Sequence, residues 1–187
     1  LVYRARDVKL HRLVALKVLA PVLAAHGGAR DRFLRWARSA AAVAHEAVVA
    51  IHAVGEERGL PYLVMEFVHG RTLEARLREG PVELPELLRI GLRIARGLSA
   101  AQDRGLVHRD IKPANILLER GSDRVKLTDF GLARALDDPG LTRVGVVAGT
   151  PEYMSPEQAR GERVDGLSDL FSLGAVLYAL ATGASPF

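Results

Sequence analysis

The first third of the chain alternates short apolar runs with one amphipathic segment. The runs at 14–19, 47–54 and 61–68 are short and rich in residues typical of strands. Between the last two runs, Gly-Glu-Glu-Arg-Gly predicts a hairpin. Residues 31–44 instead place apolar side chains on one face at helical spacing. We therefore expect strands and one helix before a break at residues 69–70.

The remainder of the chain is mostly helical by the same criterion. Thr72 is suited to cap a short helix, and apolar residues recur at helical spacing from 84 to about 102. An apolar segment at 168–182 predicts a buried helix. Two strand-like runs lie between these helices, at 115–118 and 125–128. Strands with one helix, followed mostly by helices, indicate an α+β fold with two lobes of different class.

Composition narrows the class of protein only slightly. The 187 residues, 49% apolar and 26% charged, suit one large domain or two small lobes that share a cleft. The chain has no cysteine, which excludes a disulfide framework and fits a reducing, cytoplasmic compartment. Polar residues interrupt the longest apolar stretch, 167–187, so we expect no membrane segment here. A membrane anchor elsewhere in the full-length protein stays compatible with this sequence.

The net charge of +4 arises within the first 68 residues. A basic excess is one feature of proteins that bind nucleic acid or membranes. Here the charged residues are scattered rather than clustered, which favours a solvated surface. We therefore expect no nucleic-acid partner.

Three short motifs follow one another in the second half of the chain. Residues 108–115 read His-Arg-Asp-Ile-Lys-Pro-Ala-Asn, residues 129–131 read Asp-Phe-Gly, and residues 155–157 read Ser-Pro-Glu. Upstream, residues 14–17 read Val-Ala-Leu-Lys. Each motif alone is weak, but their order and separations match the protein-kinase signature set. Over essentially its whole length the chain resembles the catalytic domain of eukaryotic-like, bacterial-type serine/threonine protein kinases.

The resemblance implies a bilobal kinase fold. Residues 1–68 correspond to a small antiparallel β lobe that contains the family's helix C and ends in a hinge at 66–68. Residues 69–187 correspond to a larger, mainly α-helical lobe, with a catalytic loop at 108–115 and an activation segment at 129–157. The chain opens in a strand-like run that follows the family's glycine-rich loop, and it stops before the family's last helices. We therefore expect both lobes to be incomplete and the chain to be truncated at both ends.

Kinases transfer the γ-phosphate of ATP mainly by positioning and by charge stabilisation. By resemblance, Asp110 accepts the proton of the substrate hydroxyl, and Lys112 reaches the transferring phosphate. Asn115 and Asp129 supply oxygen ligands to Mg²⁺, while Lys17 holds the α- and β-phosphates of ATP. The spacing Asp-x-Lys-x-x-Asn resembles serine/threonine rather than tyrosine kinases, so the implied partners are proteins modified on Ser or Thr. Taken singly, each residue is also compatible with a solvated polar side chain.

The adenine pocket is also implied by the resemblance. Ala15, Met65 and Leu117 occupy the family's apolar positions around the base, with Met65 as the gatekeeper. The backbones of Glu66 and Val68 occupy the hinge positions that hydrogen-bond the adenine edge. A plain core role for the three apolar residues is compatible with the same pocket.

Other motif residues have structural roles in the family. His108 and Phe130 correspond to side chains that pack between the two lobes, so His108 is expected to be structural and not a base. Asp169 corresponds to a buried acid that braces the catalytic loop, with an N-cap role as the alternative.

Residues 132–150 correspond to the activation loop. In the family an arginine at the position of Arg109 pairs with a phosphate on that loop, and Thr142 is the best candidate for self-phosphorylation. An unmodified loop threonine is the alternative. Thr150 is expected to bond the catalytic Asp and Lys. Glu157 is expected to lack its usual arginine partner, which lies beyond the end of this chain.

One departure from the family bears directly on activity. The family's helix C carries a Glu that pairs with the lysine equivalent to Lys17, and Trp36 stands at that position, nineteen residues beyond Lys17. A neutral indole cannot replace a carboxylate, so weakened or conditional activity is expected. The alternative to an active kinase is a pseudokinase, a nucleotide-binding regulatory module. A small-molecule phosphotransferase is disfavoured, because residues 149–157 resemble the family's protein-substrate platform.

Overall fold

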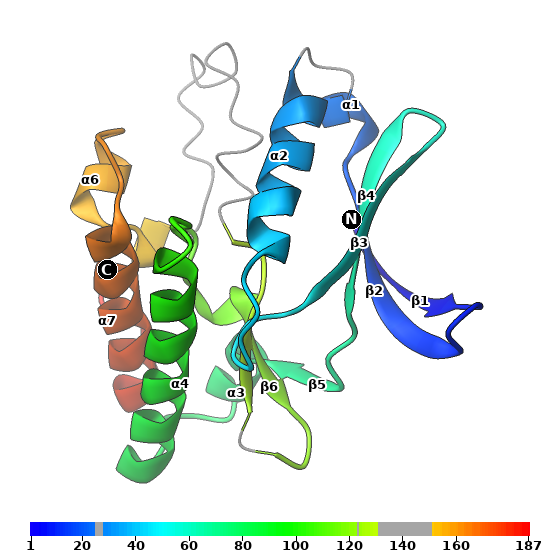
Figure 1. Ribbon diagram of the computed structural model, residues 1–187. Helices are drawn as coiled ribbons and strands as arrows, with labels where there is room; N and C mark the ends of the chain where they lie inside the picture. The colour runs from blue at the N-terminus through cyan, green and yellow to red at the C-terminus, as the bar shows by residue number, and fades with distance from the viewer. Residues whose placement is uncertain (25–27, 123, 131–150) are drawn as a thin grey trace.

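The computed structural model describes residues 1–24, 28–122, 124–130 and 151–187. A mainly β part carries one long helix, and a mainly helical part lies beside it (Figure 1). Four strands form the sheet of the first part, in the spatial order β1-β2-β4-β3, and all neighbours are antiparallel. The strands are β1 (Val2–Asp7), β2 (Arg12–Val18), β3 (Ile51–Glu57) and β4 (Leu60–Glu66).

Helix α2 (Ala29–Ala41) covers this sheet. Its buried face includes Phe33 and Ala37, which pack with Leu63 of β4 in a small hydrophobic core. The predicted hairpin is confirmed, because β3 and β4 pair as neighbours. The one-turn helix α1 (Pro21–Ala24) was not foreseen, since four residues are too few to show a periodicity.

The second part combines a small sheet with two long helices. The sheet has the order β5-β6-β7 and is antiparallel throughout. Its strands are β5 (Gly70–Thr72), β6 (Ile116–Glu119) and β7 (Val125–Leu127). The helical elements are α3 (Leu73–Leu77), α4 (Leu84–Gln102), η1 (Pro113–Asn115), η3 (Pro151–Tyr153), α6 (Pro156–Ala159) and α7 (Gly166–Thr182).

Helices α4 and α7 lie side by side (Figure 1). At their contact, a Cβ atom on Gly91 would lie 2.9 Å from Cδ2 of Leu177, so the glycine permits a close approach of the helices. Buried side chains from both helices, among them Ile94, Leu98 and Val176, form the larger core together with β6 and β7. The helical period that the sequence displayed from 84 to about 102 therefore corresponds to the face that α4 buries, apart from Leu84 and Leu88, which are exposed.

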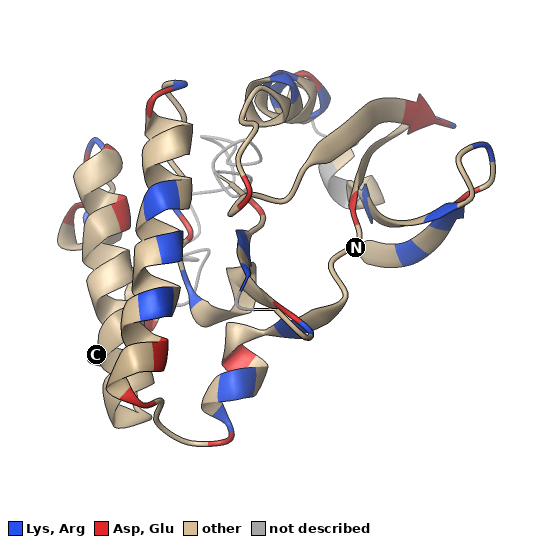
Figure 2. Ribbon diagram, turned by 60° about the horizontal axis from the view of Figure 1, so that its bottom comes forward, with Lys and Arg blue, Asp and Glu red and all other residues tan. Residues whose placement is uncertain are grey.

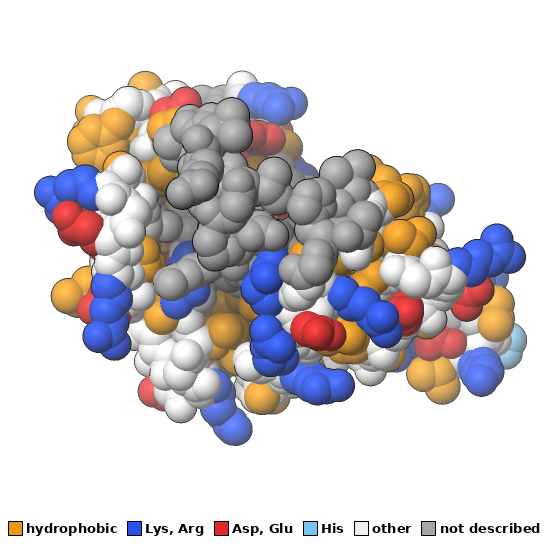
Figure 3. Space-filling model, turned by 90° about the horizontal axis from the view of Figure 1, so that it is seen from above, with side chains coloured by type: hydrophobic (Ala, Val, Ile, Leu, Met, Phe, Trp, Pro, Cys, Tyr) orange, Lys and Arg blue, Asp and Glu red, His pale blue; other side chains and the backbone are white. Residues whose placement is uncertain are grey.

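Most charged side chains lie on the surface, although Lys17, Lys126 and Asp169 are buried. Basic bands run along α4 (Figure 2), where Arg89 and Arg96 are exposed. On the face seen in Figure 3, basic and acidic side chains are interspersed among apolar ones. Within the described part of the chain, no helix is both long enough and apolar enough to cross a membrane.

Two expectations about strands need correction. Residues 47–50 lie outside β3, because Val48 instead forms an isolated parallel bridge with Leu127 of β7. The predicted break at residues 69–70 is wrong for Gly70, which opens β5 and pairs with Glu119. Both pairings join segments that are distant in sequence, so local patterning could not reveal them.

Gly70 is a steric requirement of the small sheet. A Cβ atom at this position would lie 1.9 Å from the backbone oxygen of Leu118. We expect Gly70→Ala to lower the free energy of unfolding by about 1–3 kcal/mol, because the β5–β6 pair must separate. Chemical denaturation of the wild type and the variant measures this difference.

The control for that substitution is Gly174→Ala in α7. A Cβ atom at Gly174 would meet no atom within 4 Å. We expect this variant to be neutral or up to about 1 kcal/mol more stable, because alanine is the better helix former. Equal losses in both variants would contradict the steric role of Gly70.

Candidate active site

A buried carboxylate on helix α7 holds the loop at residues 108–115 in place. Asp169 of α7 is 1% exposed and accepts hydrogen bonds from the backbone N–H groups of His108, at 2.8 Å, and Arg109, at 2.7 Å. Burial raises the pKa of Asp169, and its hydrogen bonds and the nearby His108 and Arg109 act in the opposite direction. The N-cap of α7 is Asp165. Asp169 therefore braces the loop, and the N-cap alternative is wrong.

Asp110 sits at the centre of a small polar cluster. Its Oδ2 atom lies 2.9 Å from Nζ of Lys112 and accepts a 2.8 Å hydrogen bond from Nδ2 of Asn115. The same Nδ2 atom also donates to the Asp110 backbone oxygen at 2.8 Å. Two neighbours thus hold one carboxylate oxygen of Asp110. Its Oδ1 atom is left for a further group, as far as the described residues show.

A second ion pair joins the β part to the helical part. Nζ of Lys17, on β2, lies 2.6 Å from Oδ1 of Asp129. Lys17 is 9% exposed, and the Asp129 side chain is 27% exposed. Asp129 has a φ angle of 67°, in the left-handed region that non-glycine residues seldom occupy, and such strain is frequent at functional positions.

The donor set suits Mg²⁺ better than a metal that needs a protein cage. No cluster of three or more His, Cys, Asp or Glu side chains able to hold a metal occurs among the described residues. Mg²⁺ typically uses one or two protein ligands together with phosphate oxygens and water. Asn115 directs its amide nitrogen to Asp110, so its oxygen is available, and Oδ2 of Asp129 has no described partner. Thr128 N donates to the Asn115 backbone oxygen at 3.1 Å, so the two ligand segments are adjacent.

The residues expected around adenine share one apolar cluster. Met65 is buried, and Ala15, Val68 and Leu117 pack against the same core. Ala15 and Met65 are direct cross-strand partners of β2 and β4. The backbone N–H of Glu66 donates to the Ala50 oxygen at 2.8 Å, which leaves the Glu66 carbonyl as its possible contact with a base.

His108 is buried within the protein and has no access to substrate. It is 0% exposed, its ring centroid lies 4.4 Å from that of Phe130, and its Nε2 atom is 3.0 Å from the Thr128 oxygen. Burial lowers the pKa of His108, against the opposing influence of nearby carboxylates that include Asp169. The expected structural role of His108 agrees with these contacts.

The side chain of Trp36 projects from α2 toward the sheet and Asp129. Its indole packs against both hydrophobic cores and lies 5.9 Å, between ring centroids, from Phe33. Nε1 of Trp36 is buried without a hydrogen-bond partner among the described residues. The indole lines a small apolar cavity that extends to Asp129. The other residues that line this cavity are Ala40, Val48, Val49, Ile51, Met65, Leu127, Thr128 and Phe130.

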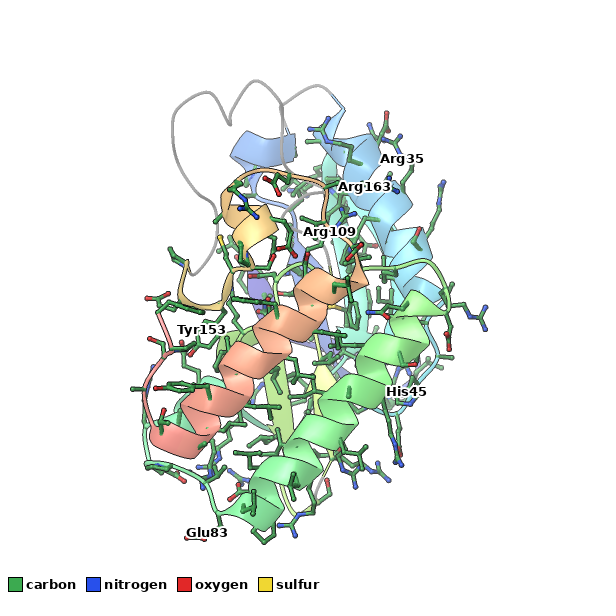
Figure 4. All side chains as sticks on the ribbon, turned by 90° about the vertical axis from the view of Figure 1, so that its left-hand side faces the viewer. Arg35, His45, Glu83, Arg109, Tyr153 and Arg163 are labelled. Carbon is green, nitrogen blue, oxygen red and sulfur yellow. The ribbon has the colours of Figure 1, made fainter. Side chains whose placement is uncertain are left out.

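Two contributors to the site were missed by sequence reasoning. Lys126 is 8% exposed, and its Nζ lies 2.7 Å from Oε2 of Glu66, so it ties the hinge to β7. Nε2 of Gln158, on α6, donates to the backbone oxygen of Arg109 at 2.7 Å, and Figure 4 shows Arg109 near α6. A lysine between Val125 and Leu127 in an apolar strand was the available signal for the first. No local sequence pattern indicated the contact between Gln158 and Arg109.

The remaining expectations concern the segment after Phe130. Thr142 and Thr150 lie outside the described residues. Glu157 accepts a hydrogen bond from the Ser168 hydroxyl, which lowers the pKa of Glu157. No ion pair of Glu157 occurs within the described ranges, and the expected loss of its arginine partner stays a prediction.

Comparison with known proteins shows the family to which the chain belongs. The protein kinase domain family matches residues 1–187. The chain therefore belongs to the protein kinase domain family, with the bilobal fold of that family.

The similar proteins are bacterial. The chain is 46% identical, over its whole length, to the probable serine/threonine-protein kinase SCO3848 of Streptomyces coelicolor and to the serine/threonine-protein kinase PknB of Mycolicibacterium smegmatis. It spans 28% and 31% of these two relatives, respectively. Among solved structures, the kinase domain of Mycobacterium tuberculosis PknI matches with a TM-score of 0.80 at 32% identity, over 100% of this chain and 68% of that one.

The burial of His108 predicts a pH-dependent stability. The folded pKa of His108 is lowered, so its stabilising contribution is present above about pH 6.5 and is lost as the pH falls through the lower folded value. His108→Phe keeps a ring next to Phe130, but it loses the contact of Nε2 with the Thr128 oxygen and the 3.3 Å hydrogen bond that Nδ1 accepts from the backbone N–H of Asp110. We expect this loss to cost about 2 kcal/mol at pH 7.

Unfolding free energies of the wild type and of His108→Phe between pH 7.5 and 5 check this prediction. We expect the advantage of the wild type to shrink as the pH falls, by at most about 1.4 kcal/mol per pH unit. A difference that is constant over this range would contradict a neutral, buried His108.

Proposed function

We propose that this protein is a serine/threonine protein kinase that transfers the γ-phosphate of MgATP to Ser or Thr hydroxyls of proteins. The observation that carries the proposal is the arrangement of Asp110, whose Oδ2 is held by Lys112 and Asn115 while Oδ1 has no partner among the described residues. A general base must be oriented toward the proton that it accepts. The 2.8 and 2.9 Å contacts provide that orientation.

Each polar residue of the site has a place in this reaction. Asp110 orients the hydroxyl and accepts its proton, and Lys112 stabilises the charge of the transferring phosphate. Lys17 holds the α- and β-phosphates of ATP. Asn115 and Asp129 would hold Mg²⁺, which when bound neutralises phosphate charge. The buried pair of lysine and carboxylate keeps Lys17 ready at the edge of the site.

The site residues for adenine follow the same proposal. Ala15, Met65 and Leu117 form the apolar walls, and their membership of one cluster supports this assignment. The carbonyl of Glu66 and the N–H of Val68 would contact the adenine edge.

We propose two lobes, residues 1–68 and 69–187, with the hinge at 66–68. The separate sheets and the two cores support this division. The relatives named serine/threonine-protein kinase support protein substrates and favour an enzyme over a pseudokinase. Self-phosphorylation at Thr142 and a cytoplasmic site of action remain predictions. The expectation that nucleic acid is not a partner also remains a prediction.

The enzyme assay uses the full-length protein, with radiolabelled ATP, Mg²⁺ and a generic basic protein as substrate. We expect Asp110→Asn to lower the rate of phosphate transfer by about 10²–10⁴-fold, because the base is lost. Asp103→Asn, an exposed aspartate at the end of α4, is the matched control and is expected to retain activity. Equal rates for the wild type and Asp110→Asn would sink the proposal.

Trp36→Glu is the variant that separates the enzyme from the pseudokinase. A wild type that transfers phosphate is an enzyme that tolerates the indole. A silent wild type whose Trp36→Glu variant transfers phosphate would instead identify the natural protein as a pseudokinase, because only the lost carboxylate separates the two forms.

A further inference from the structure

The ion-pair partner of Lys17 lies on the segment that follows β7 and not on helix α2. Helix α2 carries no acid at the position that faces the site, since Trp36 stands there. The ammonium of Lys17 is instead paired with Asp129, at 2.6 Å. Of the acids on the strands that neighbour β2, Glu66 is paired with Lys126 and Asp7 with Arg12. Within the described ranges, Asp129 is therefore the acid that holds Lys17.

The two carboxylate oxygens of Asp129 have different surroundings. Oδ1 contacts Nζ of Lys17 and lies 3.3 Å from the hydroxyl of Thr128. Oδ2 has no contact of this kind with a described residue, so it can serve a metal ion while Oδ1 retains the lysine. One side chain can thus perform both tasks.

Helix α2 is held next to the site by apolar packing instead of by an ion pair to Lys17. Trp36 packs against both cores, and it is the partly buried apolar side chain that the two cores have in common in the described chain. Its indole lines the same cavity as Asp129 and Phe130. Apolar contact, rather than an ion pair, therefore fixes the helix next to the site.

We propose that Asp129 is the positioning residue of Lys17 in this protein, in addition to its proposed role as a metal ligand, and that Trp36 has released helix α2 from that task. The inference rests on the proposed function, because Lys17 is positioned for the phosphates of ATP. In this proposal, the position of the Lys17 ammonium depends on residues 128–130. A movement of that segment would displace Lys17, whereas a movement of α2 alone would leave the ion pair in place.

The test measures the exposure of the lysine itself. The full-length protein, without nucleotide and with a chelator present, is treated with an amine-acylating reagent, and mass spectrometry follows the labelling rates of the peptides that contain Lys17 and Lys126. The chelator silences the metal-ligand role of Asp129. Lys126 is the internal control, since it is equally buried and is paired with Glu66.

We expect Asp129→Asn to raise the labelling rate of Lys17 by roughly fivefold, because a buried ammonium without its ion-pair partner opens to solvent more readily. The rate of Lys126 should stay within about twofold of the wild type, since its own ion pair is intact. Adding Trp36→Glu to Asp129→Asn should restore the protection of Lys17, because the new carboxylate enters the cavity that Asp129 lines. Adding Trp36→Gln instead is the neutral control and should restore nothing.

Two outcomes would overturn the inference. An unchanged rate for Lys17 in Asp129→Asn would show that another group holds the lysine. A rise of Lys17 and Lys126 by the same factor would show general loosening rather than the loss of one pair. Neither readout needs catalysis, so a protein that shows the predicted labelling but transfers no phosphate would refute the proposed function alone.

Discussion

The arrangement of the site depends on one buried carboxylate, that of Asp169. Two backbone N–H groups of the catalytic loop end on it, and without it both would be buried donors with no partner, a cost of about 1–3 kcal/mol each. The hydrogen bonds connect α7 to His108 and Arg109, and from there the chain leads directly to Asp110. The position of the proposed base is therefore set by the packing of a helix whose sequence lies some sixty residues further on.

A second constraint is the junction between the two parts of the molecule. Polar and apolar contacts meet there: Lys17 pairs with Asp129, Lys126 pairs with Glu66, and Trp36 packs on both cores. Both ion pairs are largely shielded from solvent, so each charge requires its partner. An indole at position 36, where the resemblance leads us to expect an acid, is compatible with this junction, because Lys17 pairs with Asp129.

Long and regular elements of the fold were predicted from the sequence better than short ones. The helix predicted from 84 to about 102 agrees with α4, because nineteen positions display its period clearly. The short strand β5 and the one-turn helices α1 and α6 were not predicted. In such elements the pairing partner or the tertiary setting decides the backbone conformation, as the contact between Gly70 and Leu118 illustrates.

The sequence by itself determined the class of the protein and the identity of the polar residues, because the motifs around Asp110, Asn115 and Asp129 carry their chemistry in a fixed order. Only the tertiary structure decided which charges meet. The pairs Lys17–Asp129 and Lys126–Glu66 join residues more than fifty positions apart, and no local pattern encodes the choice between possible partners. The choice follows from strand pairing and core packing, which bury a given ammonium and bring it within 3 Å of one carboxylate.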